Sequence, residues 1–406
     1  MRKVLIITFL LVLGVSVLYS LLKNYYHVDP EAIINQVKPP SKDIIKLLPQ
    51  GSDLNSPLNI PEGFRMAVFA DVRKIGSPRV LAFDSNGTLF ASIPSAGKVL
   101  ALPDKNRDGI ADALVEIIAS LNSPHGIDFA GDKIFIAETD KVVRYDYDSS
   151  KIKLQNPKVL FSLSGGGRHF TRTIKILEDK IYTSVGSSCD TCQEKDWQRA
   201  SILVSNLDGG DLKVFAKGLR NTVFFVFDNS GRIWGNEMGR DFLGDNLPPD
   251  ELNVIETESP STTLRTMDYG WPWCYGDRIR DTKFRGSESL DFCSKTVPSV
   301  FNYPAHIAPL GLTFIDSDLF SKEDQGSLLS AFHGSWNSSV PVGYKIVKLE
   351  VDEGKVTGME DFITGFIKGK EILGRPVDLI FDKDGVLFIS DDKADLIYIL
   401  TKELKS

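Results

Sequence analysis

A pattern of apolar and polar positions repeats along most of the chain. Each copy has an apolar stretch ending in Phe or Ile, a turn with Asp, Asn or Gly, and a second short strand rich in β-branched residues. Asn-Gly or Asp-Gly between alternating apolar residues is a strong hairpin signal. The first four copies are spaced by roughly 45–50 residues, as expected for four-stranded blades. The six copies are Val80–Ile93, His125–Glu138, Thr173–Val185, Val223–Trp234, Leu310–Phe314 and Val377–Ser390.

Six such copies predict an all-β fold, a six-bladed β-propeller over residues 61–402, with its blades around a central channel. Residues near 61–70 are expected to pair with the last blade and close the ring. Residues 255–300 do not follow the repeat, and we expect them to form an insertion over one face. An open array of β-sandwiches is the alternative architecture.

The N-terminus has a different pattern. Arg2 and Lys3 precede an apolar run from Val4 to Leu22, and roughly 17–25 apolar residues span a bilayer. Flanking positive charges stay on the cytoplasmic side. We therefore predict a transmembrane helix within residues 1–24, a linker over 25–60, and a single-pass protein of the cell membrane with its propeller outside the cytoplasm. The alternative is a cleaved signal peptide and a secreted propeller, although no Ala-x-Ala pattern marks a cleavage site.

The four cysteines are Cys189, Cys192, Cys274 and Cys293. An even number of cysteines in an exported chain favours disulfides, and we predict the bridges 189–192 and 274–293. The Cys189-x-x-Cys192 motif is not followed by His, so it is not a c-type haem site. A zinc site would need four ligands, and no nearby Cys/His cluster completes them.

The net charge of the chain indicates which kinds of partner it can bind. The formal net charge is −7 and no basic run is present, which argues against nucleic acid as a partner. An acidic surface is compatible with a small neutral ligand.

Candidate chemistry gathers at the blade boundaries. Four of the five histidines, at 125, 169, 306 and 333, lie in segments with Gly or Pro at these boundaries. Loops on one face of a propeller converge on the channel, so we predict that these histidines meet at one mouth. The alternative for each one is a structural histidine.

Two acidic segments are candidates for binding calcium. Residues 218–253 combine carboxylates with glycines, and oxygen atoms in tight loops are ligands for Ca²⁺; a solvated acidic loop is the alternative. The segment Asp104–Asp112 places oxygen side chains at positions 1, 3, 5 and 9 of an EF-hand-like loop. Position 12 is Val115 instead of Glu, so a simple hairpin turn is favoured there.

From about Gly63 to Leu400 the chain resembles the pyrroloquinoline-quinone (PQQ)-dependent glucose/sorbosone dehydrogenases, most closely the branch of sorbosone and pyranose dehydrogenases. Many motifs occur in the same order, and this makes the resemblance specific. They include Arg168-His169-Phe-Thr-Arg172-Thr, Gly218-Leu-Arg220-Asn221, Asn236-Glu237-Met-Gly239-Arg240-Asp241, Pro249-Asp250-Glu251-Leu-Asn253, His333-Gly-Ser-Trp336-Asn, Gly374-Arg375-Pro-Val-Asp378 and Ser390-Asp-Asp392-Lys393.

The resemblance implies roles for particular residues. His169 matches the general base of the family, and the backbone carbonyls of Gly239 and Arg240 match those that bind the catalytic Ca²⁺. The implied PQQ contacts are Arg220, Asn221, Arg375, His333, Arg172 and Lys393. At His333 the chain departs from the glucose-type enzymes, which carry a lysine nearby. Thr222 also follows Asn221 where proline is common.

The implied activity is oxidation of an aldose, pyranose or sorbosone-type sugar with PQQ and Ca²⁺ as cofactors. A flat tricarboxylate such as PQQ calls for arginines, and a neutral histidine can take the proton from a sugar hydroxyl. The chain has no haem motif, so electrons would pass to an external acceptor, a cytochrome or a quinone. The alternatives are a Ca²⁺-dependent lactonase and a non-catalytic binding propeller.

Overall fold

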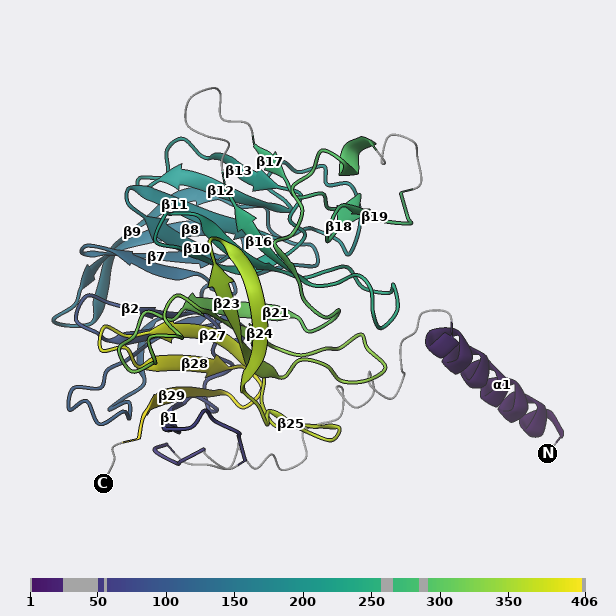
Figure 1. Cartoon of the computed structure of the whole chain (residues 1–406), viewed down its shortest axis with the longest axis horizontal. Helices are drawn as coiled ribbons and strands as arrows, with labels where there is room; N and C mark the ends of the chain where they lie inside the picture. The colour runs from purple at the N-terminus through teal and green to yellow at the C-terminus, as the bar shows by residue number, and fades with distance from the viewer. Residues whose placement is uncertain (1, 25–49, 55–56, 257–265, 285–290, 404–406) are drawn as a thin grey trace.

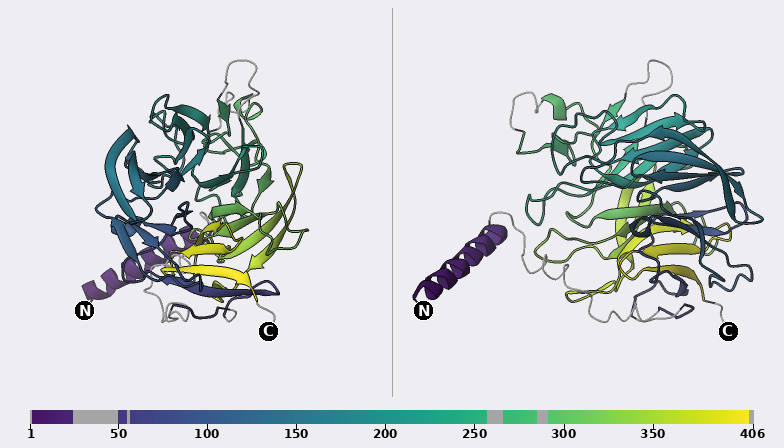
Figure 2. Two further views of the ribbon diagram at one scale, coloured as in Figure 1. Left: turned by 90° about the vertical axis from the view of Figure 1, so that its left-hand side faces the viewer. Right: turned by 180° about the vertical axis from the view of Figure 1, so that it is seen from behind.

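The computed structural model describes residues 2–24, 50–54, 57–256, 266–284 and 291–403. The prediction of a six-bladed β-propeller is confirmed: six sheets of at least four strands surround a common centre (Figure 1; Figure 2, left). The first three blades are β2–β5 (Leu81–Phe83, Leu89–Ile93, Lys98–Leu102, Val115–Ile118), β6–β9 (Ile127–Ala130, Lys133–Glu138, Lys141–Asp148, Lys153–Ser162) and β10–β13 (Ile174–Leu177, Lys180–Val185, Ser201–Asn206, Lys213–Lys217).

The fourth blade combines β14 (Thr222–Phe227), β15 (Ile233–Glu237), β16 (Glu251–Ile255) and β20 (Phe301–Asn302). The fifth blade is formed by β21 (Pro309–Phe314), β22 (Leu328–Phe332), β23 (Lys345–Asp352) and β24 (Lys355–Ile363). The sixth blade has β27 (Pro376–Phe381), β28 (Leu387–Asp391) and β29 (Leu396–Lys402), with β1 (Phe64–Asp71) as its outer strand. A short hairpin of β25 (Ile367–Lys368) and β26 (Glu371–Ile372) precedes this blade.

The two ends of the propeller meet in its last blade, as expected from the sequence. Strand β1 pairs antiparallel with β29, from Phe64 opposite Lys402 to Asp71 opposite Leu396. In Figure 1 the purple β1 accordingly lies beside the yellow β29. The ring is therefore closed by backbone hydrogen bonds between the first and last strands of the propeller.

The turn in the repeat has a direct physical explanation. The carboxylates of Asp84, Asp228 and Asp382 each accept hydrogen bonds from the backbone N–H groups two and four residues later, at 2.8–3.0 Å. These bonds close the turn between the first two strands of a blade. The same Phe-Asp pattern that marks the repeat in the sequence therefore also builds the hairpin.

The core lies between neighbouring blades. One apolar cluster joins Leu81, Leu89 and Leu100 of the first blade to Phe388 and Ile397 of the sixth. The innermost strands, β2, β6, β10, β14, β21 and β27, contact one another around the channel. At Gly126 a side chain would not fit, since a Cβ there would lie 2.5 Å from the backbone nitrogen of Ile174.

The insertion between β16 and β20 interrupts the fourth blade and adds a strand to the sheet of the third. Within it, β17 (Met267–Asp268) pairs parallel with β13 of the third blade, and β18 (Cys274–Tyr275) forms a hairpin with β19 (Ile279–Arg280). Both predicted disulfides are confirmed, Cys189–Cys192 and Cys274–Cys293. Residues 257–265 and 285–290 of the predicted insertion lie outside the described residues.

The prediction of a transmembrane helix is not supported. Residues Arg2–Asn24 form the helix α1, but among the described residues no helix is long and apolar enough to cross a membrane. Most of the predicted linker, residues 25–49 and 55–56, lies outside the described part of the chain.

Candidate active site

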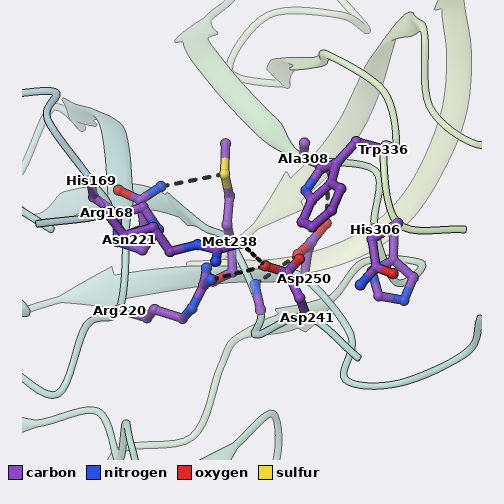
Figure 3. A pocket seen from close by; sticks show the side chains of 12 residues that line it. Arg168, His169, Arg220, Asn221, Met238, Asp241, Asp250, His306, Ala308 and Trp336 are labelled. Carbon is purple, nitrogen blue, oxygen red and sulfur yellow. Dashed lines mark hydrogen bonds and ion pairs between the residues drawn. The ribbon is translucent and has the colours of Figure 1, made fainter. Parts of the chain in front are cut away.

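A cavity of about 220 Å³ lies among the loops that lead into the innermost strands of the third, fourth and fifth blades. Figure 3 shows the side chains around it. The cavity is lined by Arg168, His169, Arg220, Asn221, Met238, Gly239, Asp241, Asp250, His306, Ala308, Trp336 and Asn337. The fold brings together five of the residues implied by the resemblance. His169, Arg220, Asn221 and Gly239 line the cavity, and Arg240 directly follows Gly239.

His169 is held in one tautomer. Its Nδ1 lies 2.9 Å from the carbonyl oxygen of Ser187, and a carbonyl can only accept a hydrogen bond, so Nδ1 carries the proton. Nε2 then has a free lone pair, and no described residue hydrogen-bonds to it. Burial and the positive charge of Arg220 lower the pKa of His169 to about 3. A neutral imidazole with an unprotonated Nε2 is the form that a general base needs.

Arg220 is fixed by three contacts and is only 4% exposed. Its Nε donates to the carbonyl oxygen of Asp190 at 2.8 Å, and one terminal nitrogen donates to the Asp190 carboxylate at 2.7 Å. The other terminal nitrogen donates to the carbonyl of Met238 at 3.1 Å. The next residue, Asn221, donates its backbone N–H to Glu237 at 2.6 Å. Burial raises the pKa of Glu237 to about 8.

The segment after β15 has the features of a metal site formed by backbone oxygens. Within the described residues, neither the Gly239 carbonyl nor the Arg240 carbonyl accepts a hydrogen bond. The Gly239 N–H is held by a carboxylate oxygen of Asp250 at 2.8 Å, and the other oxygen accepts from Ala308 N–H at 2.9 Å. Arg240 donates to Asp281 of the insertion at 3.0 Å. The loop is therefore anchored while two oxygen atoms stay available for a cation.

Two buried carboxyl groups, Asp241 and Asp250, lie close to these two carbonyls. Burial raises the pKa of Asp250 to about 7. Asp241 forms an ion pair with Arg168 and lies 3.6 Å from Arg220, and burial raises its pKa to about 6. A bound cation would offset the cost of keeping such buried carboxylates charged.

Arg375 and His333 form a separate group beside the channel and do not line the cavity. Arg375 lies 3.3 Å from the Nδ1 of His333 and donates to the carbonyl of Gly334 at 3.1 Å. The Nε2 of His333 lies 2.8 Å from Asp392, which also pairs with Arg79 at 2.6 Å. Burial alone would raise the pKa of Asp392. The neighbouring His333 and Arg79 have the larger combined effect and hold the pKa of Asp392 well below the usual range.

Two further predicted PQQ contacts also lie outside the cavity lining. Arg172 is completely buried, and its guanidinium donates to the carbonyls of His169, Thr171 and Ser164 at 2.7–3.1 Å. These bonds hold the guanidinium against the loop of His169, and a contact of Arg172 with PQQ stays a prediction. Lys393 follows β28, and its backbone N–H donates to Asp391 at 2.9 Å.

The prediction that four histidines meet at one mouth is wrong in part. His169 and His306 line the cavity, and the Nε2 of His306 donates to the carbonyl of Gly244 at 2.6 Å. His333 belongs to the neighbouring ion-pair group. His125 is fully buried beside Thr173, 3.1 Å from its hydroxyl oxygen, and packs edge-on against Phe224. His125 therefore has the structural role that was the alternative.

The acidic loop at residues 104–112 is a closed turn. Its first carboxylate, Asp104, accepts from the backbone N–H groups of Asp108 and Gly109 at 3.2 and 3.0 Å. In the described chain, the only His/Cys/Asp/Glu group with metal-binding geometry is Cys189, Cys192 and Glu194, and both cysteines are in a disulfide.

Sequence reasoning assigned no role to several residues that build the site. Arg168, Trp336 and Asn337 lie in the recognised motifs and line the cavity, and Asp190 lies next to Cys189 and holds Arg220. The guanidinium of Arg168 lies 5.8 Å from the ring centre of Trp336, whose ring contacts that of Phe242 edge-on. The motifs contained the signal, but contacts across three loops are not visible in a linear sequence.

The fold and the cavity define a class of six-bladed propellers with a polar site of histidine, arginine and carboxylate side chains at the mouth of the channel. The chain belongs to the TrAA12-like family, whose model matches residues 58–403. This match confirms the family resemblance found in the sequence.

Two relatives illustrate the likeness. An uncharacterized protein of Borreliella burgdorferi is 32% identical over 363 residues, which cover 85% of this chain and 91% of that protein. A PQQ-dependent pyranose dehydrogenase of Coprinopsis cinerea is 24% identical and also covers 85% of the chain, but only 54% of its own length is matched. The chain thus spans about half the length of that enzyme.

Solved structures share the fold. The holo PQQ domain of the Coprinopsis cinerea enzyme has a TM-score of 0.73 at 24% identity and covers 87% of this chain and 98% of that domain. A calcium structure of a Trichoderma reesei carbohydrate-active enzyme of family AA12 has a TM-score of 0.74 at 20% identity. The match covers 88% of this chain and 98% of the Trichoderma reesei chain.

Proposed function

We propose that this chain is an oxidoreductase that oxidises an aldose, pyranose or sorbosone-type sugar with PQQ and Ca²⁺ as its cofactors. The observation that carries the proposal is the position of His169, neutral and with Nε2 free, in the same cavity as Arg220 and Asn221. The names of the relatives support the same chemistry, since one is PQQ-dependent and a structural neighbour is a calcium structure.

The residues present fit both cofactors. The two unpaired carbonyl oxygens of Gly239 and Arg240, with Asp241 and Asp250 nearby, suit a hard cation such as Ca²⁺. Arg168 and Arg220 supply positive charge for carboxylates on the same cavity wall. When bound, PQQ supplies the quinone that accepts a hydride, and Ca²⁺ acts on it as a Lewis acid.

The protein's own residues supply the proton chemistry and the orientation. Nε2 of His169 takes the proton of the sugar hydroxyl as the hydride leaves the adjacent carbon. The Nδ1–H bond to Ser187 keeps Nε2 unprotonated until it takes this proton. Arg220 and Asn221 keep their positions through Asp190 and Glu237, so the cofactor side of the cavity is fixed before a ligand arrives.

The proposal is tested by titrating the purified protein with PQQ in the presence of Ca²⁺ and following the absorbance spectrum. Aldoses and pyranoses are then assayed with an artificial electron acceptor. We expect saturable PQQ binding, sugar-dependent reduction of the acceptor, and loss of both after chelation of Ca²⁺. A protein that binds no PQQ under these conditions contradicts the proposal.

The rival activity is a Ca²⁺-dependent lactonase, which needs side-chain carboxylates free to bind the metal. Asp241 and Asp250 do line the cavity. Both oxygens of Asp250 already accept backbone N–H groups, and Asp241 is paired with Arg168, so this function is less well supported. Hydrolysis of a lactone without PQQ would favour it.

Two further proposals concern the electron acceptor and the cellular compartment in which the propeller works. Because the chain carries no haem motif, we propose that an external cytochrome or quinone reoxidises the cofactor. We also propose that the propeller works outside the cytoplasm, because stable disulfides such as the two in this chain form in oxidising compartments. Cell fractionation, with thiol labelling before and after reduction, tests the second point.

A further inference from the structure

A buried ion pair ties the insertion between β16 and β20 to the segment Gly239–Arg240. One terminal nitrogen of Arg240 donates to both carboxylate oxygens of Asp281, at 3.0 and 3.1 Å. The Asp281 side chain is 2% exposed and that of Arg240 is 14% exposed. The attraction between two charges is stronger where water is excluded, so this contact fixes the side chain of Arg240. The same residue offers its backbone carbonyl as one of the two oxygens available for a cation.

Asp281 is itself held in place by the rest of the insertion. Its backbone N–H donates to the carbonyl of Trp273 at 2.7 Å, and the backbone N–H of Lys283 donates to its carboxylate at 2.8 Å. The disulfide between Cys274 and Cys293 closes the chain around this part of the insertion. The carboxylate of Asp281 therefore has a fixed position before any ligand binds.

Close packing alone does not fix the segment on the side of the insertion. A second, small cavity of about 20 Å³ lies there, and Gly239, Arg240, Trp271 and Asp281 are among the residues that line it. This cavity has room for about one water molecule. The position of Arg240 therefore depends on polar contacts, namely the ion pair with Asp281 and the 3.2 Å bond from its Nε to the Asp241 carbonyl.

We propose that Asp281 is a positioning residue of the calcium site, which acts through Arg240 and makes the insertion a part of that site. Residues that orient a metal ligand affect metal affinity even though they do not touch the metal. Here the ligand is a backbone carbonyl, and the side chain of the same residue sets the path of that backbone. The proposal rests on the function proposed above and deepens it.

The direction of the effect separates positioning from simple attraction of charges. A nearby carboxylate attracts a cation through space, and a nearby guanidinium repels it. If only these charges mattered, Asp281→Asn would weaken Ca²⁺ binding and Arg240→Gln would strengthen it. If the ion pair positions the carbonyl, both variants weaken Ca²⁺ binding, because Arg240→Gln keeps the backbone carbonyl but loses the contact. The double variant then loses no more than either single variant, because one contact is missing in all three.

The test measures Ca²⁺ binding itself, by calorimetry on the calcium-free full chain, without PQQ and with PQQ. Wild type is compared with Asp281→Asn, Arg240→Gln and the double variant. Asp291→Asn is the matched control, because Asp291 lies in the same insertion and forms an exposed ion pair with Lys295. Arg240→Gln leaves Asp281 buried without its partner, which can destabilise the fold. Should it fold poorly, the double variant decides, since through-space charge alone predicts wild-type affinity for it.

We expect Kd for Ca²⁺ to rise about 10–100-fold in all three variants and to keep its wild-type value in the control. Tighter binding in Arg240→Gln, or wild-type affinity in Asp281→Asn or in the double variant, overturns the proposal. A wild-type protein that binds Ca²⁺ but no PQQ overturns the proposed function, and the Ca²⁺ titrations then still test Asp281. A wild-type protein that binds no Ca²⁺, with or without PQQ, overturns both.

Discussion

Asp190 holds Arg220 through two different atoms, its carboxylate at 2.7 Å and its backbone carbonyl at 2.8 Å. The same carboxylate accepts the backbone N–H of Asp241 at 2.9 Å. Asp190 itself lies between the bridged Cys189 and Cys192. One short loop therefore sets the direction of the arginine and the path of the chain after β15.

The Asp190→Asn variant tests this positioning role. The backbone contact to Arg220 remains, but the charge-assisted bond is lost, which costs about 1–3 kcal/mol when the site is buried. We expect PQQ to bind about 10-fold more weakly, with Kd measured by absorbance titration. The charge-matched control, Asp208→Asn in the exposed turn after β12, should keep wild-type affinity. Wild-type affinity in Asp190→Asn as well would contradict the positioning role.

Gly186 keeps His169 and Asn221 at their separation. A Cβ at this position would lie 2.7 Å from the Cβ of His169 and 2.7 Å from the Oδ1 of Asn221. We expect Gly186→Ala to displace both and to lower kcat/KM by about 100-fold, as a misplacement near 1 Å can do. Gly165→Ala is the control, because the nearest atom to its added Cβ is 3.5 Å away. Steady-state kinetics of both variants decides the matter, and equal rates would show that the contact relaxes freely.

The sequence was sufficient to predict the blades because the information is local. The apolar alternation and the Asp residues at the turns specify each hairpin, and Asp84 and Asp382 show how the side chain closes it. Pairing of β1 with β29 also followed, since a closed ring leaves no other partner for the first strand. The transmembrane helix, predicted from the length of the apolar run and its flanking positive charges, is not supported by the structure.

Only those site residues that belong to recognisable motifs could be predicted from the sequence. His169, Arg220 and Asn221 were identified from their motifs and lie together. Arg172 resembles them in the sequence, but burial turns its guanidinium toward backbone carbonyls. Burial and side-chain direction depend on contacts between distant loops, and these contacts are visible only in three dimensions.

The His169→Gln variant separates chemistry from cofactor binding. It removes the base and keeps a polar side chain, and loss of a general base typically costs about 10²–10⁴ in rate. We expect the rate of PQQ reduction by sugar to fall by that factor in single-turnover experiments, with PQQ affinity unchanged. His306→Gln is the matched variant, because glutamine can still donate to the Gly244 carbonyl, and it should have a much smaller effect. Similar rates in His169→Gln and wild type would exclude His169 as the base.

The histidines of the propeller should all titrate below the usual pKa of a histidine. Burial lowers the pKa of each of the four, to about 3 for His169. NMR titration of a His27→Gln protein, with His169 assigned by loss of its signal in His169→Gln, should therefore show no propeller histidine with a midpoint at 6.5 or above.

The sign of the effect on stability follows from the same shifts. A histidine whose pKa is lower in the folded state takes up a proton on unfolding, so the free energy of unfolding falls as the pH drops below 6.5. For His169 this loss continues to about pH 3, and replacing it should flatten the acid side of the stability curve. Denaturant unfolding of wild type and His169→Gln at pH 7.5 and 5 measures the difference. A wild-type protein that loses no more stability than the variant over this interval would show that His169 ionises normally.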